Sequence, residues 1–576
     1  MARDRRAGLL IALMLVALSC APPSRPAPAS GGGQSSAAAP APASAPKWIT
    51  AAFLSDPPTL MNRVNSAVAG GRTSAGITEL ADIVNSSMTV VVGRGAVEPR
   101  LAEAVPTIEN GLWRVLPDGR TETTYRIKTG AQWHDGTPLT AADLVFTAQV
   151  AQDRELPFVR VLAYDLIDAI EVVDMRTALV KWKRPFIEAD LLFAGPELIP
   201  RHILERPYLE DAANFAHLPY WSTEYVGLGP FKLREFARSS HLVMEANDGY
   251  ILGRPKLDGI EIRFIPDSNT LSANILADAV QLTIGQNFSL ETGLTVAEQW
   301  RGGRMEVSAA SAGNPMHIFP QFINPSPAVI GDLRFRRALY HAIDRQEIVD
   351  STMAGKAVLA DAILWDPNDR EWPGIEQGIV RYPFDPRRAT QLIDELGYPR
   401  GADGFYRDPA TGQRLTVELR TLVSFDTGVK IIFPIADYWQ RTGVAVETLV
   451  VPVQRQSDRE YRAARPGFDL ARSPRDLTRH HGDEIALPEN RFTGANRARY
   501  GNPEFDALID RYYVTIPWTE RMMVLSQVVR HMTDQVTVMG IFFDVTPAMA
   551  TNRLVNIKAG RMGTDPINAH EWDLRA

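Results

Sequence analysis

The sequence contains a single cysteine, Cys20, among its 576 residues. One cysteine cannot form an internal disulfide, a cysteine-based zinc finger or a four-cysteine iron–sulfur site. Positive charge is not in excess either, because 61 Lys and Arg stand against 68 Asp and Glu, giving a formal net charge of -7. A nucleic-acid-binding surface needs a basic excess, so we expect no nucleic-acid partner.

Long apolar runs are also scarce. The longest, Ala7–Leu18, has twelve residues and follows a start that carries Arg3, Arg5 and Arg6. A transmembrane helix needs about 20 apolar residues, whereas the core of a signal peptide needs fewer. We therefore interpret residues 1–19 as a signal peptide and expect no membrane-spanning helix in the rest of the chain.

The apolar run ends in Ala17-Leu18-Ser19-Cys20, which resembles the lipobox of bacterial lipoproteins. In a lipobox, a signal peptidase cuts before the cysteine, whose thiol then carries a diacylglycerol. Ala17 departs from the usual Leu, Val or Ile, so an ordinary secretory signal with an unrelated cysteine remains the alternative. The following 26 residues are Ala, Pro, Ser or Gly except for Arg25 and Gln34. Such a segment buries too little apolar area to fold, and we expect residues 20–46 to be a lipidated cysteine and a mobile tether.

The remaining chain has the composition of a globular protein, with 45% hydrophobic and 22% charged residues overall. Its length suggests about three or four domains, or two large lobes. Runs typical of strands are interspersed with capped helices, which predicts a mixed α/β fold, and no repeat of fixed period indicates a solenoid or propeller. The strand-like runs are Trp48–Leu54, Thr123–Lys128, Ile170–Val173, Gly259–Ile265, Leu415–Leu422 and Val444–Val451.

Capping residues mark several helix starts. Thr140 and Asp143 have the spacing of a capping box. Asp332 precedes Leu333–Val349, whose apolar residues recur with the period of one buried helix face, which predicts a single helix. Two further helices are expected to begin where an N-cap residue precedes a proline in the first turn. These starts are Asp385-Pro386 and Asn502-Pro503.

The sequence lacks a phosphate-binding loop, an H-E-x-x-H zinc helix and a G-x-S-x-G nucleophile elbow. His134 and Asp135 are adjacent, but the following Gly136-Thr137-Pro138 favours a turn over an acid–base pair. Arg479–Glu484 contains four potential metal ligands, although hydrated loops of this composition are common and neighbouring histidines seldom chelate one ion well. We expect no catalytic residue, no metal and no cofactor.

Several segments, read in order, resemble the family 5 extracellular solute-binding proteins, the peptide- and nickel-type receptors of ATP-binding-cassette importers. The most specific is 124–146, T-Y-R-I-K-T-G-A-Q-W-H-D-G-T-P-L-T-A-A-D-L-V-F. The resemblance covers residues 47–576. The other matching segments are Val226–Phe231, Arg337–Arg345, Asp385–Gly397 and Tyr500–Asp506.

This resemblance implies an α/β fold of the periplasmic-binding-protein-like class II, in which a hinge joins two lobes. It also implies an extra α/β domain inserted in the first lobe and a ligand enclosed between the lobes. The expected division is 47–82, 218–317 and 521–576 for the first lobe, 83–217 for the extra domain, and 318–520 for the second lobe.

The peptide receptors that the chain resembles contain a loop of the form Ala-Arg-Ser-Gly-Trp-x-x-Asp. The Asp of this loop pairs with the amino group of the peptide. The corresponding loop here is 471–478, in which Arg472 and Ser473 match and Thr478 replaces the Asp. Either Asp476 or Asp483 takes over the amine, or the ligand lacks a free amino terminus, because an unpaired buried ammonium costs several kcal/mol.

Three arginines crowd this loop, Arg472, Arg475 and Arg479, and would suit a carboxylate or another anion. The alternative is that they face solvent. The resemblance places the opposite wall of the site at residues 55–60 and near Phe322, and Trp365 and Phe425 are aromatic candidates. The predicted ligand-binding residues are Asp56, Thr59, Phe322, Phe425, Arg472, Ser473, Arg475 and Asp476.

The expected function is therefore an extracytoplasmic receptor that captures a peptide or peptide-like solute and delivers it to the transmembrane subunits of a permease. We expect a monomer held at the membrane by its lipid. One alternative is a receptor of the same fold for an anion, a nickel complex or an oligosaccharide. The others are a secreted hydrolase that uses His134-Asp135 or the 480–484 loop, and a sensory or adaptor lipoprotein.

Overall fold

The computed structural model describes residues 45–54, 56–64, 76–93, 95–158, 161–308, 314–560 and 563–575. The predicted signal peptide, the lipidation site Cys20 and the tether up to residue 44 lie outside the described residues. Pro46–Ala576 forms one compact unit. No helix among the described residues has the length and apolarity required to cross a membrane.

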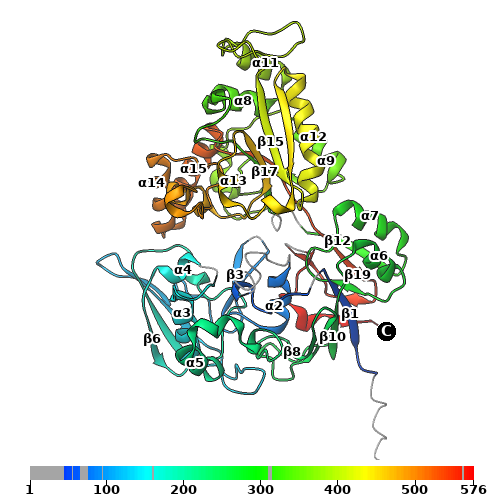
Figure 1. The fold of residues 1–576 in the computed structure, drawn as a ribbon. Helices are drawn as coiled ribbons and strands as arrows, with labels where there is room; N and C mark the ends of the chain where they lie inside the picture. Colours follow the sequence, from blue (N-terminus) through cyan, green and yellow to red (C-terminus); the bar gives the residue numbers. More distant parts are fainter. Residues whose placement is uncertain are drawn as a thin grey trace, which may run out of the picture. The chain divides into compact units, whose positions relative to one another are not determined.

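A seven-stranded sheet forms the core of the predicted first lobe (Figure 1). The predicted strand at Trp48–Leu54 is confirmed as β1 (Trp48–Phe53), and it pairs in parallel with the confirmed strand β10 (Gly259–Phe264) and with β11 (Leu282–Thr283). Because β1 lies inside the sheet, Phe53 is fully buried, as expected for a strand covered on both faces. The other strands are β8 (Phe231–Ala237), β9 (His241–Ala246), β12 (Gly303–Val307) and β19 (Pro547–Thr551).

A six-stranded sheet has the order β14-β18-β13-β17-β15-β16. Alternate residues of β15 (Thr416–Leu422), including Val417 and Leu419, are fully buried in a core shared with α12 (Asp426–Arg441), which lies along β15 and β16 (Ala445–Val451) in Figure 1. The remaining strands are β13 (Pro315–Phe319), β14 (Val358–Leu359), β17 (Phe468–Arg472) and β18 (Met539–Phe543).

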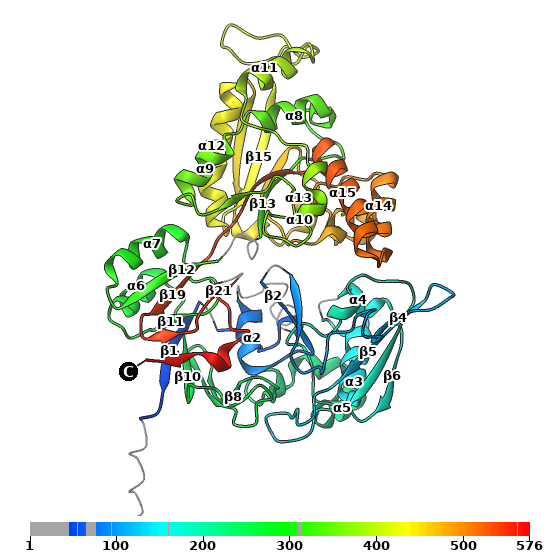
Figure 2. The same ribbon diagram turned by 180° about the vertical axis from the view of Figure 1, so that it is seen from behind.

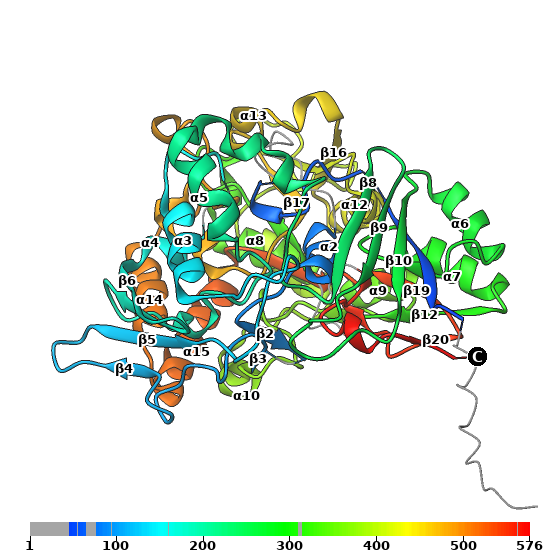
Figure 3. The same cartoon turned by 90° about the horizontal axis from the view of Figure 1, so that it is seen from below.

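A four-stranded antiparallel sheet belongs to the predicted extra domain. Helix α3 (Ala141–Gln152) packs against two of its strands, and α5 (Arg201–Glu210) packs against α3 (Figure 3). The capping box predicted for α3 is confirmed, because Asp143 Oδ2 accepts hydrogen bonds from the backbone and hydroxyl of Thr140. The strands are β4 (Trp113–Val115), β5 (Thr121–Arg126), β6 (Ile167–Asp174) and β7 (Thr177–Trp182).

The single helix predicted over Leu333–Val349 is wrong. The structure has α8 (Leu333–His341) followed by α9 (Arg345–Thr352). The first helix ends at Ala342, its C-cap, and Asp344 accepts a hydrogen bond from the backbone of Glu347 at 2.9 Å as the N-cap of the second helix. The apolar period continued across this break and concealed it.

The caps predicted for two other helices are confirmed. Asp385 accepts a hydrogen bond from the backbone of Arg388 and begins α11 (Pro386–Asp394). Asn502 does the same for Phe505 and begins α14 (Pro503–Val514).

Strand pairing differs from the expected division at two segments. Residues 315–317 and 539–543 were assigned to the first lobe, yet they belong to β13 and β18, adjacent strands inside the six-stranded sheet. The expected division placed the crossing at 317–318 and 520–521, but the chain completes this sheet before it returns to the seven-stranded one, where β19 pairs with β12 (Figure 2).

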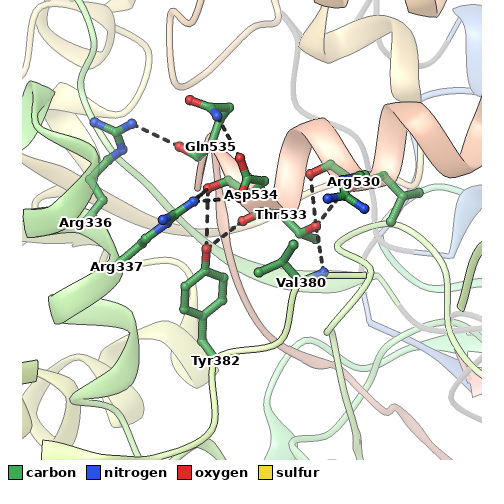
Figure 4. A network of polar contacts seen from close by, with 9 residues as sticks. Arg336, Arg337, Val380, Tyr382, Arg530, Thr533, Asp534 and Gln535 are labelled. Carbon is green, nitrogen blue, oxygen red and sulfur yellow. Dashed lines mark hydrogen bonds and ion pairs between the residues drawn. The ribbon is translucent and has the colours of Figure 1, made fainter. Parts of the chain in front are cut away.

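Polar contacts hold the end of α15 (Trp518–Asp534), just before β18, against α8 and Tyr382 on the side of the six-stranded sheet. Helix α15 ends against α8, where Arg337 Nη2 lies 2.6 Å from Asp534 Oδ1 and Arg336 Nη2 donates to the Gln535 carbonyl at 2.9 Å (Figure 4). The hydroxyl of Tyr382 donates to the Thr533 carbonyl at 3.0 Å. Cationic guanidinium groups at the carboxyl end of a helix also stabilise its dipole.

Candidate functional site

The chain passes from one large sheet to the other at two points, between β12 and β13 and between β18 and β19. The two passages touch, because the backbone N–H of Asp544 donates to the carbonyl of Asn314 at 3.0 Å. Two short adjacent connections between sheets are the geometry of a hinge. The candidate site is the set of residues around this crossing.

Arg472, the last residue of β17, contacts the crossing directly. Its guanidinium pairs with the carboxylate of Asp544 and donates to Gln286 Oε1 at 3.0 Å, and it lies 5.1 Å from the ring centre of Phe425. Gln286 follows β11, so Arg472 joins the second sheet, the crossing and the first sheet. Burial raises the pKa of Asp544, and the positive charge of Arg472 opposes that rise.

Arg475 is also paired with carboxylates. Its guanidinium contacts Asp369, lies 3.6 Å from Asp366 Oδ2, and donates to the Leu364 carbonyl at 2.7 Å. Asp366 is fully buried. Burial raises the pKa of Asp369 to about 6, while Arg475 acts in the opposite direction.

These pairs correct the expectation that positive charge crowds the 471–478 loop. Arg472 and Arg475 are each neutralised by acidic residues, and Arg479 lies 3.5 Å from Asp476. The physical reason is that a guanidinium removed from water needs a counter-charge.

Asp476 has a local role in the structure. Its Oδ1 accepts hydrogen bonds from the backbone and hydroxyl of Thr478 at 3.0 and 2.6 Å and caps a short 3-10 helix. Its Oδ2 faces Arg479. Asp483, the other candidate amine anchor, has a side chain that is 94% exposed. The replacement of the family's Asp by either residue therefore stays a prediction.

The remaining predicted contacts lie just beyond strands of the two large sheets, after β17 and after β1. Ser473 extends the pairing of β17, since its backbone N–H donates to the Pro315 carbonyl at 3.0 Å. Asp56 accepts a hydrogen bond from the backbone of Ser239 at 2.8 Å and lies 3.3 Å from Arg238, beside the β8–β9 turn. Thr59 is buried, and its hydroxyl donates to the Met61 carbonyl at 3.1 Å.

All three aromatic candidates pack against a hydrophobic core, Phe322 and Trp365 against one core and Phe425 against another. Phe322 meets the ring of Tyr500 at 4.8 Å and lies under the guanidinium of Arg336. Trp365 is partly buried against the same core, whereas Phe425 lies beneath Arg472 at the start of α12. The structure thus brings Phe425 and Arg472 together and places Phe322 elsewhere.

His134 stabilises a turn, as its sequence context favours. Its Nδ1 accepts a hydrogen bond from the backbone of Gly227, so its Nε2 carries the proton and donates to the Gly229 carbonyl at 3.1 Å. Burial lowers its pKa to about 4. A Cβ at Gly227 would lie 2.0 Å from the Val84 carbonyl oxygen, which explains the glycine.

His480 is buried as well, and burial lowers its pKa to about 4. Within the described ranges, no group of three or more His, Cys, Asp or Glu side chains is arranged to hold a metal ion.

Sequence reasoning missed Gln286, Asp544, Asp366 and Asp369. Asp544 lies 72 residues and Gln286 lies 186 residues from Arg472 along the chain. No local motif marks such partners. The one available signal was general: a buried arginine near a crossing requires acidic neighbours.

The chain belongs to the bacterial extracellular solute-binding proteins, family 5, because the model of the family's middle region matches residues 96–476. This membership and the sheet architecture confirm the two-lobed periplasmic-binding fold, and the family consists of substrate-binding proteins.

Among its relatives, a putative peptide-binding protein of an ABC transporter from Brucella ovis is 28% identical over 294 residues. The alignment covers 50% of this chain and 51% of that protein, so the match spans about half the length of this curated relative. The oligopeptide-binding protein AppA of Bacillus subtilis is 24% identical over 468 residues, covering 78% of each chain. The solved structure of NikZ from Campylobacter jejuni in complex with Ni(L-His) has a TM-score of 0.72 at 16% identity. The match covers 92% of this chain and 100% of that one, and it shows that the two proteins have a similar fold.

Proposed function

We propose that this chain is the extracytoplasmic substrate-binding component of an ABC importer. It captures a peptide or peptide-like solute between its two lobes and delivers it to the transmembrane subunits of a permease. The observation that carries the proposal is the family match over residues 96–476, together with a crossing at which Arg472 links the two sheets. The names of the Brucella and Bacillus relatives support a peptide as the ligand.

The ligand site in this proposal lies at the carboxyl end of β17 and the loop that follows it, since ligands of open α/β sheets bind beyond the carboxyl ends of strands. Phe425 and the 471–478 loop line its second-lobe side, and residues 56–60 line its first-lobe side. Because Arg472 and Arg475 are already paired with carboxylates, they position the loop that contacts the ligand.

A receptor for a non-peptide solute is the second candidate, and Thr478 is the observation that favours it. This residue stands where peptide receptors have the Asp that pairs with an amine, and Asp476 is engaged in a cap. A ligand without a free amino terminus requires no such anchor.

The proposal includes a membrane-anchored monomer without catalytic activity. Cys20 carries the lipid, and the Ala-, Pro-, Ser- and Gly-rich segment up to residue 46 spaces the lobes from the membrane. Revised by the strand pairing, the second lobe runs from about residue 314 to about residue 544, and the extra domain remains 83–217.

Native mass spectrometry of the gently purified full-length protein tests the ligand class. A series of bound masses matching short peptides supports peptide import. One discrete non-peptide mass selects the second candidate. A protein that carries no solute and binds none from peptide or metabolite mixtures contradicts the proposal.

A further inference from the structure

The second lobe contains a cavity of about 280 Å³ that is separate from the crossing. It lies on the face of β15 opposite to α12: Val417 and Leu419 point into the core shared with α12, so Glu418 and Arg420 point to the other side. The segment between β16 and β17, which includes α13 (Arg459–Ala463), forms the other wall. None of Arg472, Gln286 and Asp544 lines the cavity.

The cavity is lined by charges of both signs, and two of these charges form no ion pair among the described residues. Glu418 and Arg465 line it, and in the described part of the chain neither forms an ion pair. One carboxylate oxygen of Glu418 and Nε of Arg465 are buried without a hydrogen-bond partner. A buried polar atom without a partner is uncommon and indicates a missing ligand group or water.

The positive side of the cavity is preorganised. Arg465 is 2% exposed and donates to the Phe319 carbonyl at 3.0 Å, whereas Arg420 is 3% exposed and donates to the Tyr461 carbonyl at 3.0 Å. The rotamers of both guanidinium groups are therefore fixed before any ligand binds. Asp469 is the buried carboxylate near them, with its Oδ1 3.7 Å from Arg420.

The rim adds an aromatic surface and a further pair of charges. The guanidinium of Arg455 lies 4.1 Å from the ring centre of Tyr461 and 3.6 Å from Asp458. Glu460 is exposed beside them.

The volume of the cavity lies just below the range of about 300–1,000 Å³ for sites of drug-sized ligands, which suits a solute of the size of an amino acid.

We propose that this cavity is a second binding site, independent of the inter-lobe site, for a small zwitterion such as a free amino acid. The ammonium group pairs with Glu418, and the carboxylate pairs with the guanidinium side formed by Arg465 and Arg420. Burial raises the pKa of Glu418 and lowers that of Arg465 to about 9, and a ligand charge of opposite sign relieves both shifts.

The test uses L-alanine as the probe, with propionate and ethylamine as compounds that each retain one of its two charges. Binding to the full-length protein is measured by saturation-transfer NMR and isothermal titration calorimetry. L-alanine is expected to bind. Each single-charge compound is expected to lose at least about tenfold in affinity, because one charged contact is lost.

Glu418→Gln is expected to weaken L-alanine binding about tenfold. Glu447→Gln is the matched control, since Glu447 lies opposite Glu418 on β16 without lining the cavity. The proposal is overturned if L-alanine does not bind, if propionate or ethylamine binds equally well, or if Glu418→Gln has no effect. That last result assigns any binding to another site and leaves the proposed import function untouched.

Discussion

Arg472 at the end of β17 forms an ion pair with Asp544 in the passage between β18 and β19. The same guanidinium donates to Gln286 beside the first sheet. A residue predicted from the sequence to contact ligand therefore also supports the hinge. The predicted ligand contact of Arg472 would couple ligand binding to the position of the lobes.

Removing Arg472 is expected to destabilise the protein strongly. Arg472→Ala leaves Asp544 buried without its counter-charge, and breaking a buried pair in this way costs about 3–5 kcal/mol. Chemical denaturation followed by circular dichroism measures the loss. The matched control is Arg479→Ala, because Arg479 and its partner Asp476 are both partly exposed and such a pair contributes less than about 1 kcal/mol. Equal losses in the two variants would contradict this role of Arg472.

Acid is expected to destabilise the fold through its buried histidines. Burial lowers the pKa of His134 to about 4, below the ordinary histidine value of 6.5. Between these two values the unfolded chain binds a proton that the folded chain does not, so stability is lost as the pH falls from about 6.5 towards 4. Burial lowers the pKa of His317 to about 3 and that of His480 to about 4, so all three act in the same direction.

His134→Gln tests this pH dependence. The variant loses one of the three contributions, so its melting temperature is expected to fall less steeply between pH 7.5 and pH 5 than that of the parent protein. His202→Gln is the control, since His202 is on the surface beside Asp135. A parallel pH dependence in parent and His134→Gln would show that His134 does not contribute.

The break between α8 and α9 is expected to depend on Asp344. Asp344→Ala removes the N-cap of α9 and is expected to cost about 1 kcal/mol, whereas Asp344→Asn retains most of the stability because Asn is an equally good cap. Thermal unfolding compares the two with Asp350→Ala, an exposed position on the same helix. Equal stability of the Ala and Asn variants would show that the cap is dispensable.

Cys20→Ala is expected to release the protein from membranes, because no lipid can then be attached and a signal peptide alone does not retain it. Fractionation of expressing cells measures the soluble and membrane-bound shares. Retention of the variant in the membrane fraction would contradict the lipobox interpretation.

Local signals predicted much of the secondary structure. The Thr140–Asp143 capping box and the Asp385 cap act within three or four residues, so the sequence contains all the information that they need. The same reasoning failed at Asp344, where apolar periodicity continued through a cap. The pairing of β13 with β18 joins segments more than 200 residues apart, and no local pattern specifies it.

The candidate site was less predictable for the same physical reason. The arginines of the 471–478 loop are visible in the sequence, but their net electrostatic effect depends on Asp544, Asp366 and Asp369, which folding brings to them. A side chain's charge is local, whereas its neutralisation is a property of the tertiary structure. Arginine content alone suggested an anionic ligand. Because carboxylates already pair with Arg472 and Arg475, arginine content no longer supports that suggestion.

The central claim, capture of a solute by movement of the lobes, is tested most directly by a distance measurement between spin labels. The chain has one cysteine, so a Cys20→Ala background accepts labels only at introduced sites. Leu209→Cys in α5 and Phe433→Cys in α12 use side chains that are 71% and 54% exposed. Removal of the copurified solute is predicted to shift the inter-label distance distribution, and adding the solute back is predicted to restore it. An identical distribution with and without solute would contradict the account.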